Sequence, residues 1–216
     1  IITNWYRTQA YYDSGSWRAS WTGEGGGVLL NQAPHNLDLW QWIFGMPKKI
    51  RAFCSFGKYH NIDVEDDVTI YGEYESGATA VFITTTGETP GTNRLEITGD
   101  LGKLVLEEEK LKWWKLAAPE REFCFTVSEG FYVPETTYEE FTQEAPAGHP
   151  IILENFAKSI LEDAPMIAPG IEGINSLALS NAAYISSWTN DFVELPTDEA
   201  LFEDHLLRLC REEKLK

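Results

Sequence analysis

The sequence predicts an α+β fold, in which a large, open and mostly antiparallel sheet has helices packed on one face. Two observations lead to this prediction. Apolar residues alternate with period two from Lys48 to about Phe141, and helical spacing precedes and follows this block. Turn signals such as Gly99-Asp100-Leu101-Gly102 separate several of the alternating runs, and short turns join antiparallel neighbours.

The first 47 residues predict a short strand, a loop and a helix. Residues 1–7 are β-prone, and residues 11–27 are polar, aromatic and glycine-rich. We expect a helix to begin near Leu30, because Pro34 suits a first helical turn and apolar residues then recur at helical spacing, at Leu37, Trp40, Ile43 and Phe44. Gly45 and Pro47 end this pattern.

The central block contains runs that are typical of strands, and several alternate so that one face is buried and the other is polar or open to a partner. These runs are residues 48–57, 66–77, 78–87, 93–100, 102–110, 110–117 and 122–127. Helical spacing returns after Gly148 in three apolar stripes. The stripes are Ile152, Phe156 and Ile160; Leu177, Ala178, Ala182, Ile185 and Trp188; and Leu201, Phe202, Leu206 and Leu209.

Composition excludes several classes of function. The chain has 216 residues and a net charge of −17, and such an acidic surface repels nucleic acid and anionic membranes. No apolar run approaches the roughly 20 residues of a membrane span, and no signal peptide is visible. The three cysteines form no close pair, which favours reduced thiols and a cytoplasmic location. Because the chain starts at Ile1 within a strand-like run, we expect a preceding N-terminal part.

The stretch from Gly23 to Trp42 contains the densest candidate for chemistry, and four interpretations compete. A phosphate-binding loop is disfavoured, because the glycines match neither G-x-G-x-x-G nor G-x-x-x-x-G-K-[ST]. A metal site at His35 and Asp38 lacks further ligands at a useful spacing, so we expect no metal. The glycines instead allow a tight turn or a close approach.

Catalysis and a plain core helix remain for the same stretch. Asn31 and His35 lie four residues apart and would project to one side of a helix that begins near Leu30, although Asn31 could instead cap the helix. A histidine there can give or take a proton near neutral pH. Spacing alone favours a packed, hydrogen-bonded histidine, so both interpretations stay open at this point.

The same stretch resembles the signature of the Gfo/Idh/MocA oxidoreductases, the family of glucose–fructose oxidoreductase and inositol dehydrogenase. The matching positions are Gly25, Gly26, Gly27, Leu29, His35, Asp38, Trp42 and Gly45. Further segments resemble the family's C-terminal domain in order, and together they extend the resemblance over nearly the whole chain. These segments are residues 65–67, 75–82, 94–104, 149–150, 155–160 and 173–187.

The resemblance implies that residues 1–216 form the C-terminal domain of a two-domain oxidoreductase, with the open sheet of a glyceraldehyde-3-phosphate dehydrogenase-like C-terminal domain. An N-terminal Rossmann domain, absent from this chain, would bind most of the NAD or NADP. A family lysine that assists catalysis would also lie there, so the isolated chain is expected to be inactive. The implied substrate is a sugar or polyol such as inositol, oxidised at a secondary alcohol.

The resemblance also implies roles for individual residues. His35 matches the family's proposed acid/base, which takes the hydroxyl proton while hydride moves to nicotinamide. The family commonly has aspartate where this chain has Asn31, which can hydrogen-bond a hydroxyl but carries no charge. Asp38, one helical turn beyond His35, is expected to contact substrate or to hold the helix or the histidine in place; an acid on the helix surface is the alternative.

The aromatic loop supplies the remaining expectations. Arg18, Tyr12 and Trp17 are candidate substrate contacts, because sugar rings stack on aromatic groups and leave their hydroxyls to polar ones. Packing at an interface is the alternative, and a surface ion pair is favoured for Arg94.

An exposed sheet face is expected to pair subunits into a homodimer or homotetramer. A non-catalytic ligand-binding or regulatory member of the family is the competing interpretation. A free-standing carbohydrate-binding β domain is disfavoured by the helical last third of the chain.

Overall fold

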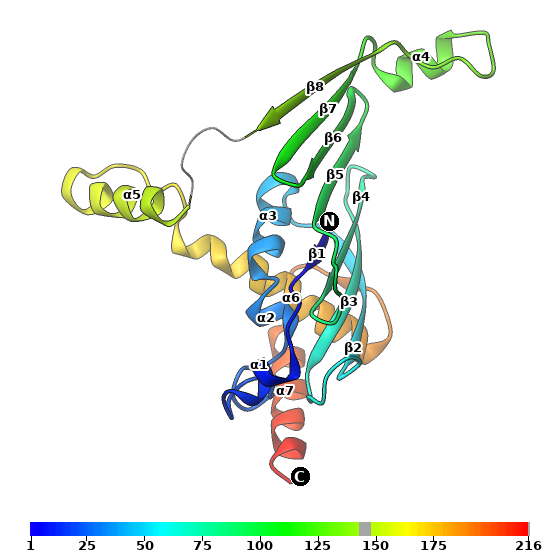
Figure 1. Cartoon of the computed structure of the whole chain (residues 1–216). Coiled ribbons are helices and arrows are strands. Elements are labelled where there is room, and N and C mark those ends of the chain that lie inside the picture. The colour runs from blue at the N-terminus through cyan, green and yellow to red at the C-terminus, as the bar shows by residue number, and fades with distance from the viewer. Residues whose placement is uncertain (143–147, 216) are drawn as a thin grey trace.

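A computed structural model describes residues 1–142 and 148–215. Its nine-stranded sheet has the order β8-β7-β6-β5-β1-β4-β3-β2-β9, with helices against one face of its β2–β4 half (Figure 1). The strands are β1 (Ile2–Asn4), β2 (Lys49–Phe56), β3 (Glu65–Glu73), β4 (Thr79–Thr85), β5 (Arg94–Gly99), β6 (Gly102–Glu107), β7 (Lys110–Leu116), β8 (Thr136–Thr142) and β9 (Val193–Glu194). The predicted α+β class and its open, mostly antiparallel sheet are confirmed.

Helices precede and follow the strand block along the chain, as the sequence predicted, and one further helix, α4, lies within it. They are α1 (Gln9–Asp13), α2 (Val28–Asn31), α3 (Pro34–Phe44), α4 (Glu120–Thr126), α5 (His149–Glu162), the short 3-10 helix η1 (Gly170–Glu172), α6 (Gly173–Thr189) and α7 (Glu199–Glu213).

The N-terminal strand joins two antiparallel groups of strands. β1 pairs in parallel with β4, where Ile2 lies opposite Ile83, and antiparallel with β5, where Ile2 lies opposite Arg94. The chain therefore leaves the middle of the sheet at Trp5 and runs on toward α1. This placement brings residues 5–7 beside the end of β4, because the Trp5 and Arg7 amides donate to the carbonyls of Thr85 and Thr86, each at 2.9 Å.

The core lies between the β2–β4 half of the sheet and the helices α3 and α6. Ala52, Ile70 and Phe82 are aligned across the three strands and are fully buried. Trp40 of α3 stacks on Phe82, with ring centroids 5.8 Å apart and planes inclined by 15°. Within the part of the chain that the structure describes, no helix covers the opposite face of these strands, and Phe53 and Val81 are exposed there.

Residues 122–127 do not form the predicted strand; they belong mostly to helix α4. β7 pairs directly with β8 along its whole length. No additional strand can therefore insert between β7 and β8. The start of helix α4 is instead hydrogen-bonded to Asp100. The Asp100 carbonyl accepts from the Glu120 amide, and its carboxylate accepts from the Arg121 amide. Alternation over six residues could not distinguish these outcomes.

Helix α5 projects from the sheet and buries none of its residues (Figure 1). Its predicted apolar stripe, Ile152, Phe156 and Ile160, is exposed. The next helix behaves differently, since α6 buries Leu179, Ala182 and Ile185 among others. The periodicity of α5 therefore correctly predicted a helix, but this stripe does not contribute to the core of this chain.

The β6–β7 hairpin is expected to gain stability from a change of its turn residues. Glu108 and Glu109 have φ of 52° and 60°, in the left-handed region that favours Asn and Gly. The double variant Glu108→Asn/Glu109→Gly should raise the free energy of unfolding by about 1 kcal/mol, measured by urea denaturation. Glu75→Asn is the matched control, because Gly77 already supplies the positive φ of its turn. If the double variant were no more stable than the unmodified chain, the backbone strain assigned to Glu108 and Glu109 would be contradicted.

Candidate functional site

The glycines before α2 allow the backbone of this turn to lie very close to β3 and α6. A Cβ added to Gly27 would lie 2.0 Å from the backbone oxygen of Glu65, and one added to Gly26 would lie 2.1 Å from the Tyr184 hydroxyl. Gly25 has a φ of +78°. The expected close approach is therefore present, and it is made to other parts of this chain.

A buried carboxylate holds this glycine turn in place. Glu65, fully buried at the start of β3, accepts hydrogen bonds from the Gly27 and Leu29 amides, both at 2.9 Å. The Tyr184 hydroxyl also donates to it, at 2.7 Å. Burial raises the pKa of Glu65 to about 7, against the opposing effect of these hydrogen bonds. The carboxylate thus fixes the first turn of α2, and with it the segment that carries Asn31.

The raised pKa of Glu65 predicts a pH-dependent contribution to stability. The folded state holds this proton more tightly than an unfolded chain with a pKa near 4.5. The contribution is therefore fully present below pH ~4.5 and is lost as the pH rises to ~7, by up to about 3 kcal/mol. Glu65→Gln should flatten the fall in unfolding free energy between those pH values, whereas the exposed control Glu154→Gln should not. Identical pH slopes for Glu65→Gln and the unmodified chain would contradict this prediction.

Asn31 and His35 lie on two separate helices, which corrects the expectation of one helix that begins near Leu30. α2 ends at Asn31, and the Ala33 amide closes a tight turn by donating to the Val28 carbonyl at 2.8 Å. α3 then begins at Pro34 with Ala33 as its N-cap, so Asn31 does not cap it. His35 consequently lies in the first turn of α3, while Asn31 lies at the end of the preceding helix.

His35 is exposed and lies beside an aromatic ring. The Trp5 and His35 ring centroids are 6.2 Å apart. The neighbouring Asn36 side chain accepts hydrogen bonds from the Trp5 indole at 3.2 Å and from the Thr3 hydroxyl at 3.3 Å, which holds Trp5 near α3. Among residues 1–142 and 148–215, no hydrogen bond engages the His35 ring. Its imidazole is therefore available to an incoming group.

Asn31, Arg18 and Trp17 lie in one cluster around Tyr11. The Tyr11 hydroxyl donates to Asn31 at 3.3 Å and accepts from the Arg18 guanidinium at 2.8 Å. That guanidinium lies 4.4 Å from the ring centroids of both Tyr11 and Trp17. The Asn31 amide also donates to Glu24. Three of the predicted site residues thus meet, with Tyr11 as the group they share.

The last helix anchors the loop that carries this cluster. Glu213 of α7 accepts hydrogen bonds from the Trp21 and Thr22 amides, both at 2.8 Å. A Cβ added to Gly23 would lie 2.4 Å from the Trp17 carbonyl oxygen, so the loop folds tightly on itself there. Trp17 and Arg18 are therefore presented by a loop with fixed ends.

The Tyr12 hydroxyl and the Asp38 side chain take no part in the hydrogen bonds of this cluster, although the Tyr12 ring packs edge-on against Tyr11 with centroids 5.2 Å apart. Only 7% of Tyr12 is exposed, and its hydroxyl donates to Thr86 at 2.9 Å. Desolvation raises the pKa of Tyr12 to about 12. Tyr12, a predicted substrate contact, is therefore buried with its hydroxyl engaged by Thr86. Asp38 is exposed on α3 and accepts from Gln41 at 2.9 Å, which supports a role in holding the helix.

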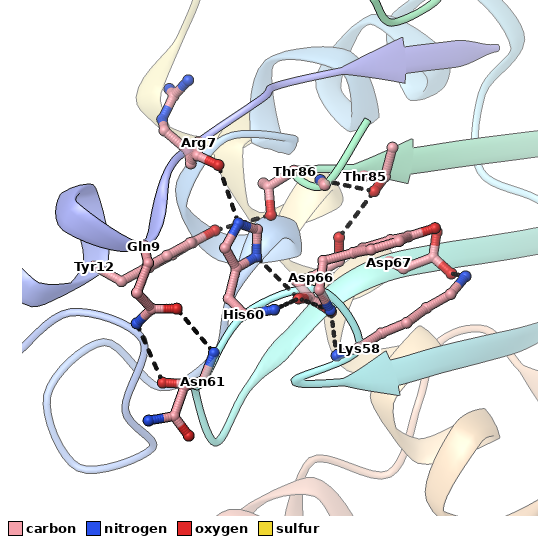
Figure 2. A network of polar contacts seen from close by, with 12 residues as sticks. Arg7, Gln9, Tyr12, Lys58, His60, Asn61, Asp66, Asp67, Thr85 and Thr86 are labelled. Carbon is pink, nitrogen blue, oxygen red and sulfur yellow. Dashed lines mark hydrogen bonds and ion pairs between the residues drawn. The ribbon is translucent and has the colours of Figure 1, made fainter. Parts of the chain in front are cut away.

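Figure 2 shows a buried network that sequence reasoning missed. Asp66 accepts from the backbone amides of residues 58–60 and contacts the Nδ1 of His60 at 3.0 Å. The Nε2 of His60 lies 3.0 Å from the Arg7 carbonyl. The acidic run at residues 65–67 resembles a solvated surface segment, and the signal for burial was its position at the start of a strand. The network ties the segment after β1 to β3.

Two other features lie apart from the cluster. Arg94 pairs with Glu96 at 2.5 Å and Glu107 at 2.9 Å, as the favoured interpretation of a surface ion pair expected. A cavity of about 840 Å³ lies between β1, α3 and the β5–β8 strands. Asn36 lines that cavity, whereas His35 does not.

Residues 1–142 and 148–215 contain no group of three or more potential metal ligands. None of their helices combines the length and apolar character that a membrane span requires.

Comparisons with known proteins place these features in context. Residues 2–195 match the profile described as "Oxidoreductase family, C-terminal alpha/beta domain". The chain is similar to the WlbA dehydrogenase of Chromobacterium violaceum, solved with NADH and UDP-GlcNAcA, at 27% identity and a TM-score of 0.65. That match covers 92% of this chain and 54% of the other. A search of curated proteins gives no match.

Two further solved structures are similar to this chain over most of its length. The WlbA dehydrogenase of Bordetella pertussis, with NADH and UDP-GlcNAcA, is 26% identical with a TM-score of 0.63, covering 91% of this chain and 54% of that one. A levoglucosan dehydrogenase, solved with NADH and levoglucosan, is 16% identical with a TM-score of 0.71, covering 91% and 58%. The latter likeness concerns the fold alone. The chain spans little more than half the length of these structures.

Proposed function

The chain belongs to the Gfo/Idh/MocA oxidoreductase family through its C-terminal α/β domain, and on this premise we propose that it is the substrate-binding and oligomerisation domain of a two-domain, NAD(P)-dependent enzyme. The proposed reaction is oxidation of a secondary alcohol in a sugar or polyol. One observation carries the proposal: His35 lies exposed in the first turn of α3, with no hydrogen bond to the described residues. The two WlbA dehydrogenases solved with NADH and UDP-GlcNAcA support it.

The proposed role of His35 is that of the base. As hydride leaves the carbinol carbon, the neutral imidazole takes the hydroxyl proton, so that the C–O bond becomes a carbonyl. In the reverse direction the imidazolium returns the proton.

The proposed substrate contacts are Arg18, Trp17, Asn31 and Tyr11. Tyr11 takes the role first expected of Tyr12, because its hydroxyl lies within the cluster and the Tyr12 hydroxyl lies in the core. Asn31 donates and accepts hydrogen bonds but cannot hold a charge, so it orients a hydroxyl.

A nicotinamide cofactor supplies the hydride acceptor when it is bound. The donor set of this chain fits only the reacting end of such a cofactor: an exposed imidazole near an indole, without a glycine fingerprint for the phosphates. We therefore assign most of the NAD or NADP contacts to a preceding Rossmann domain.

The open sheet face is the proposed subunit interface. Phe53 and Val81 are 58% and 47% exposed there, and apolar groups on an uncovered sheet are typical of a contact between subunits. Light scattering should find a dimer or tetramer, and a strict monomer would contradict this assignment.

A non-catalytic member of the family is the second candidate, favoured by Asn31 in place of the usual aspartate. Reduction of NAD+ and NADP+ by the two-domain protein, measured at 340 nm against a panel of sugars and polyols, distinguishes the two. Turnover supports the enzyme. Saturable binding of a sugar without turnover supports the non-catalytic alternative and would contradict the proposed reaction.

A further inference from the structure

Two guanidinium groups contact the ring of Tyr11. The Arg7 guanidinium carbon lies 5.0 Å from the ring centroid, and that of Arg18 lies 4.4 Å from it. Both side chains are partly buried. Two like charges on one aromatic ring repel each other, and the ring's attraction for each cation offsets only part of that cost.

Neither guanidinium has a carboxylate within 4.0 Å among residues 1–142 and 148–215. Arg7 donates to the carbonyls of Trp5 at 3.3 Å and Tyr6 at 2.9 Å, and Arg18 donates to the Tyr11 hydroxyl. These bonds all use Nη1 of the two side chains, and a guanidinium has five N–H donors. The nearby Glu24 carboxylate accepts instead from Asn31 and from the Ala19 amide. Each arginine therefore keeps unused donors beside the candidate site.

The backbone of Arg7 is fixed on both sides. Its amide donates to the Thr86 carbonyl at 2.9 Å, and its carbonyl faces the Nε2 of His60 at 3.0 Å. The Nδ1 of His60 lies 3.0 Å from the Asp66 carboxylate, so both ring nitrogens contact oxygen atoms. The side chains of His60 and Asp66 are 7% and 0% exposed. Figure 2 shows the Arg7 guanidinium directed away from this network.

The Tyr11 ring is held by the same network. Tyr12, its neighbour on α1, donates to Thr86 at 2.9 Å and packs on His60, with ring centroids 4.8 Å apart. The Tyr12 ring also packs edge-on against the Tyr11 ring, with centroids 5.2 Å apart, so buried contacts position both the Arg7 backbone and the Tyr11 ring. Binding an anion there requires little reordering of backbone, which favours affinity.

We propose that the substrate is an anionic sugar, whose carboxylate or phosphate is held by Arg7 and Arg18. This inference rests on the proposed function of the domain and specifies its substrate class. Guanidinium groups bind both kinds of anion through paired N–H donors. The chain has a net charge of −17, so most of its surface repels anions. Arg7 and Arg18 make the local charge positive, which directs an anion to this position.

The test uses the two-domain protein with NAD+ and three probes: D-glucuronate, D-glucose 6-phosphate and D-glucose. Binding is measured by calorimetry and turnover at 340 nm. We expect at least one anionic probe to bind ~10-fold or more tightly than glucose, with binding that weakens as NaCl rises. The preferred anion identifies carboxylate or phosphate as the natural group.

Arg7→Gln and Arg18→Gln should each weaken binding of that anion by ~10-fold or more, while glucose binding changes by less than ~3-fold. Arg121→Gln removes the same charge from exposed helix α4 and should leave both unchanged. Equal affinity for glucose and both anions, or equal loss for all probes in the arginine variants, would overturn the inference. Selective anion binding without turnover would leave it standing and contradict the proposed oxidation.

Discussion

Replacing His35 with alanine should lower kcat of the two-domain enzyme by roughly 10²–10⁴-fold, the range that a positioned acid/base contributes. KM should change little, because the substrate contacts proposed here belong to Arg18, Trp17, Tyr11 and Asn31. Since His35 is exposed and accepts no hydrogen bond within the described residues, the melting temperature should also be nearly unchanged. A loss of kcat at constant stability would therefore report chemistry at this imidazole.

His149→Ala provides the matched control. His149 is the first residue of the projecting helix α5 and is also exposed. Initial rates of NAD+ reduction should be lost in His35→Ala and retained in His149→Ala. Unchanged turnover in His35→Ala would remove His35 from the role of base, and a matching fall in both variants would point to a nonspecific effect.

Replacing Gly27 with alanine should destabilise the domain by at least about 3 kcal/mol. The added Cβ would lie 2.0 Å from the Glu65 carbonyl oxygen, which is backbone and cannot turn aside. Separating α2 from β3 would also lengthen the hydrogen bonds from the Gly27 and Leu29 amides to the Glu65 carboxylate. A buried carboxylate that loses such partners is costly.

Gly173→Ala is the corresponding control, because no atom lies within 4 Å of its added Cβ and Gly173 begins α6. Its unfolding free energy should stay within about 1 kcal/mol of the unmodified chain, as judged by urea denaturation. If Gly27→Ala were as stable as Gly173→Ala, the close contact between α2 and β3 would not exist in solution.

Local patterns predicted elements better than they predicted partners. Alternation predicted β2 to β7, and β2 to β4 have one face buried against the helices of the core. The same alternation at residues 122–127 was wrong, since β8 already occupies the edge of β7. The stripe of α5 predicted a helix but not its exposed position. Periodicity records a preference for burial, and the site of burial depends on the remaining elements.

Local sequence likewise indicated candidate site residues but not the partners that surround them. The family resemblance drew attention to His35, and the aromatic loop to Arg18 and Trp17. The choice of Tyr12 over Tyr11 rested on composition alone. Adjacent residues on a short helix point in different directions, and only the contact with Thr86 placed Tyr12 in the core.

The sequence by itself determined the α+β class, most strands and helices, the family and the histidine at the start of α3. The tertiary structure alone decided that β1 lies between β4 and β5, and that Glu65, Asp66 and His60 form the buried support of the site. The physical reason is range. Helix and strand periodicity arises from neighbours a few residues apart, whereas burial of a carboxylate depends on donors that the chain brings from distant segments, as Gly27, Leu29 and Tyr184 are brought to Glu65.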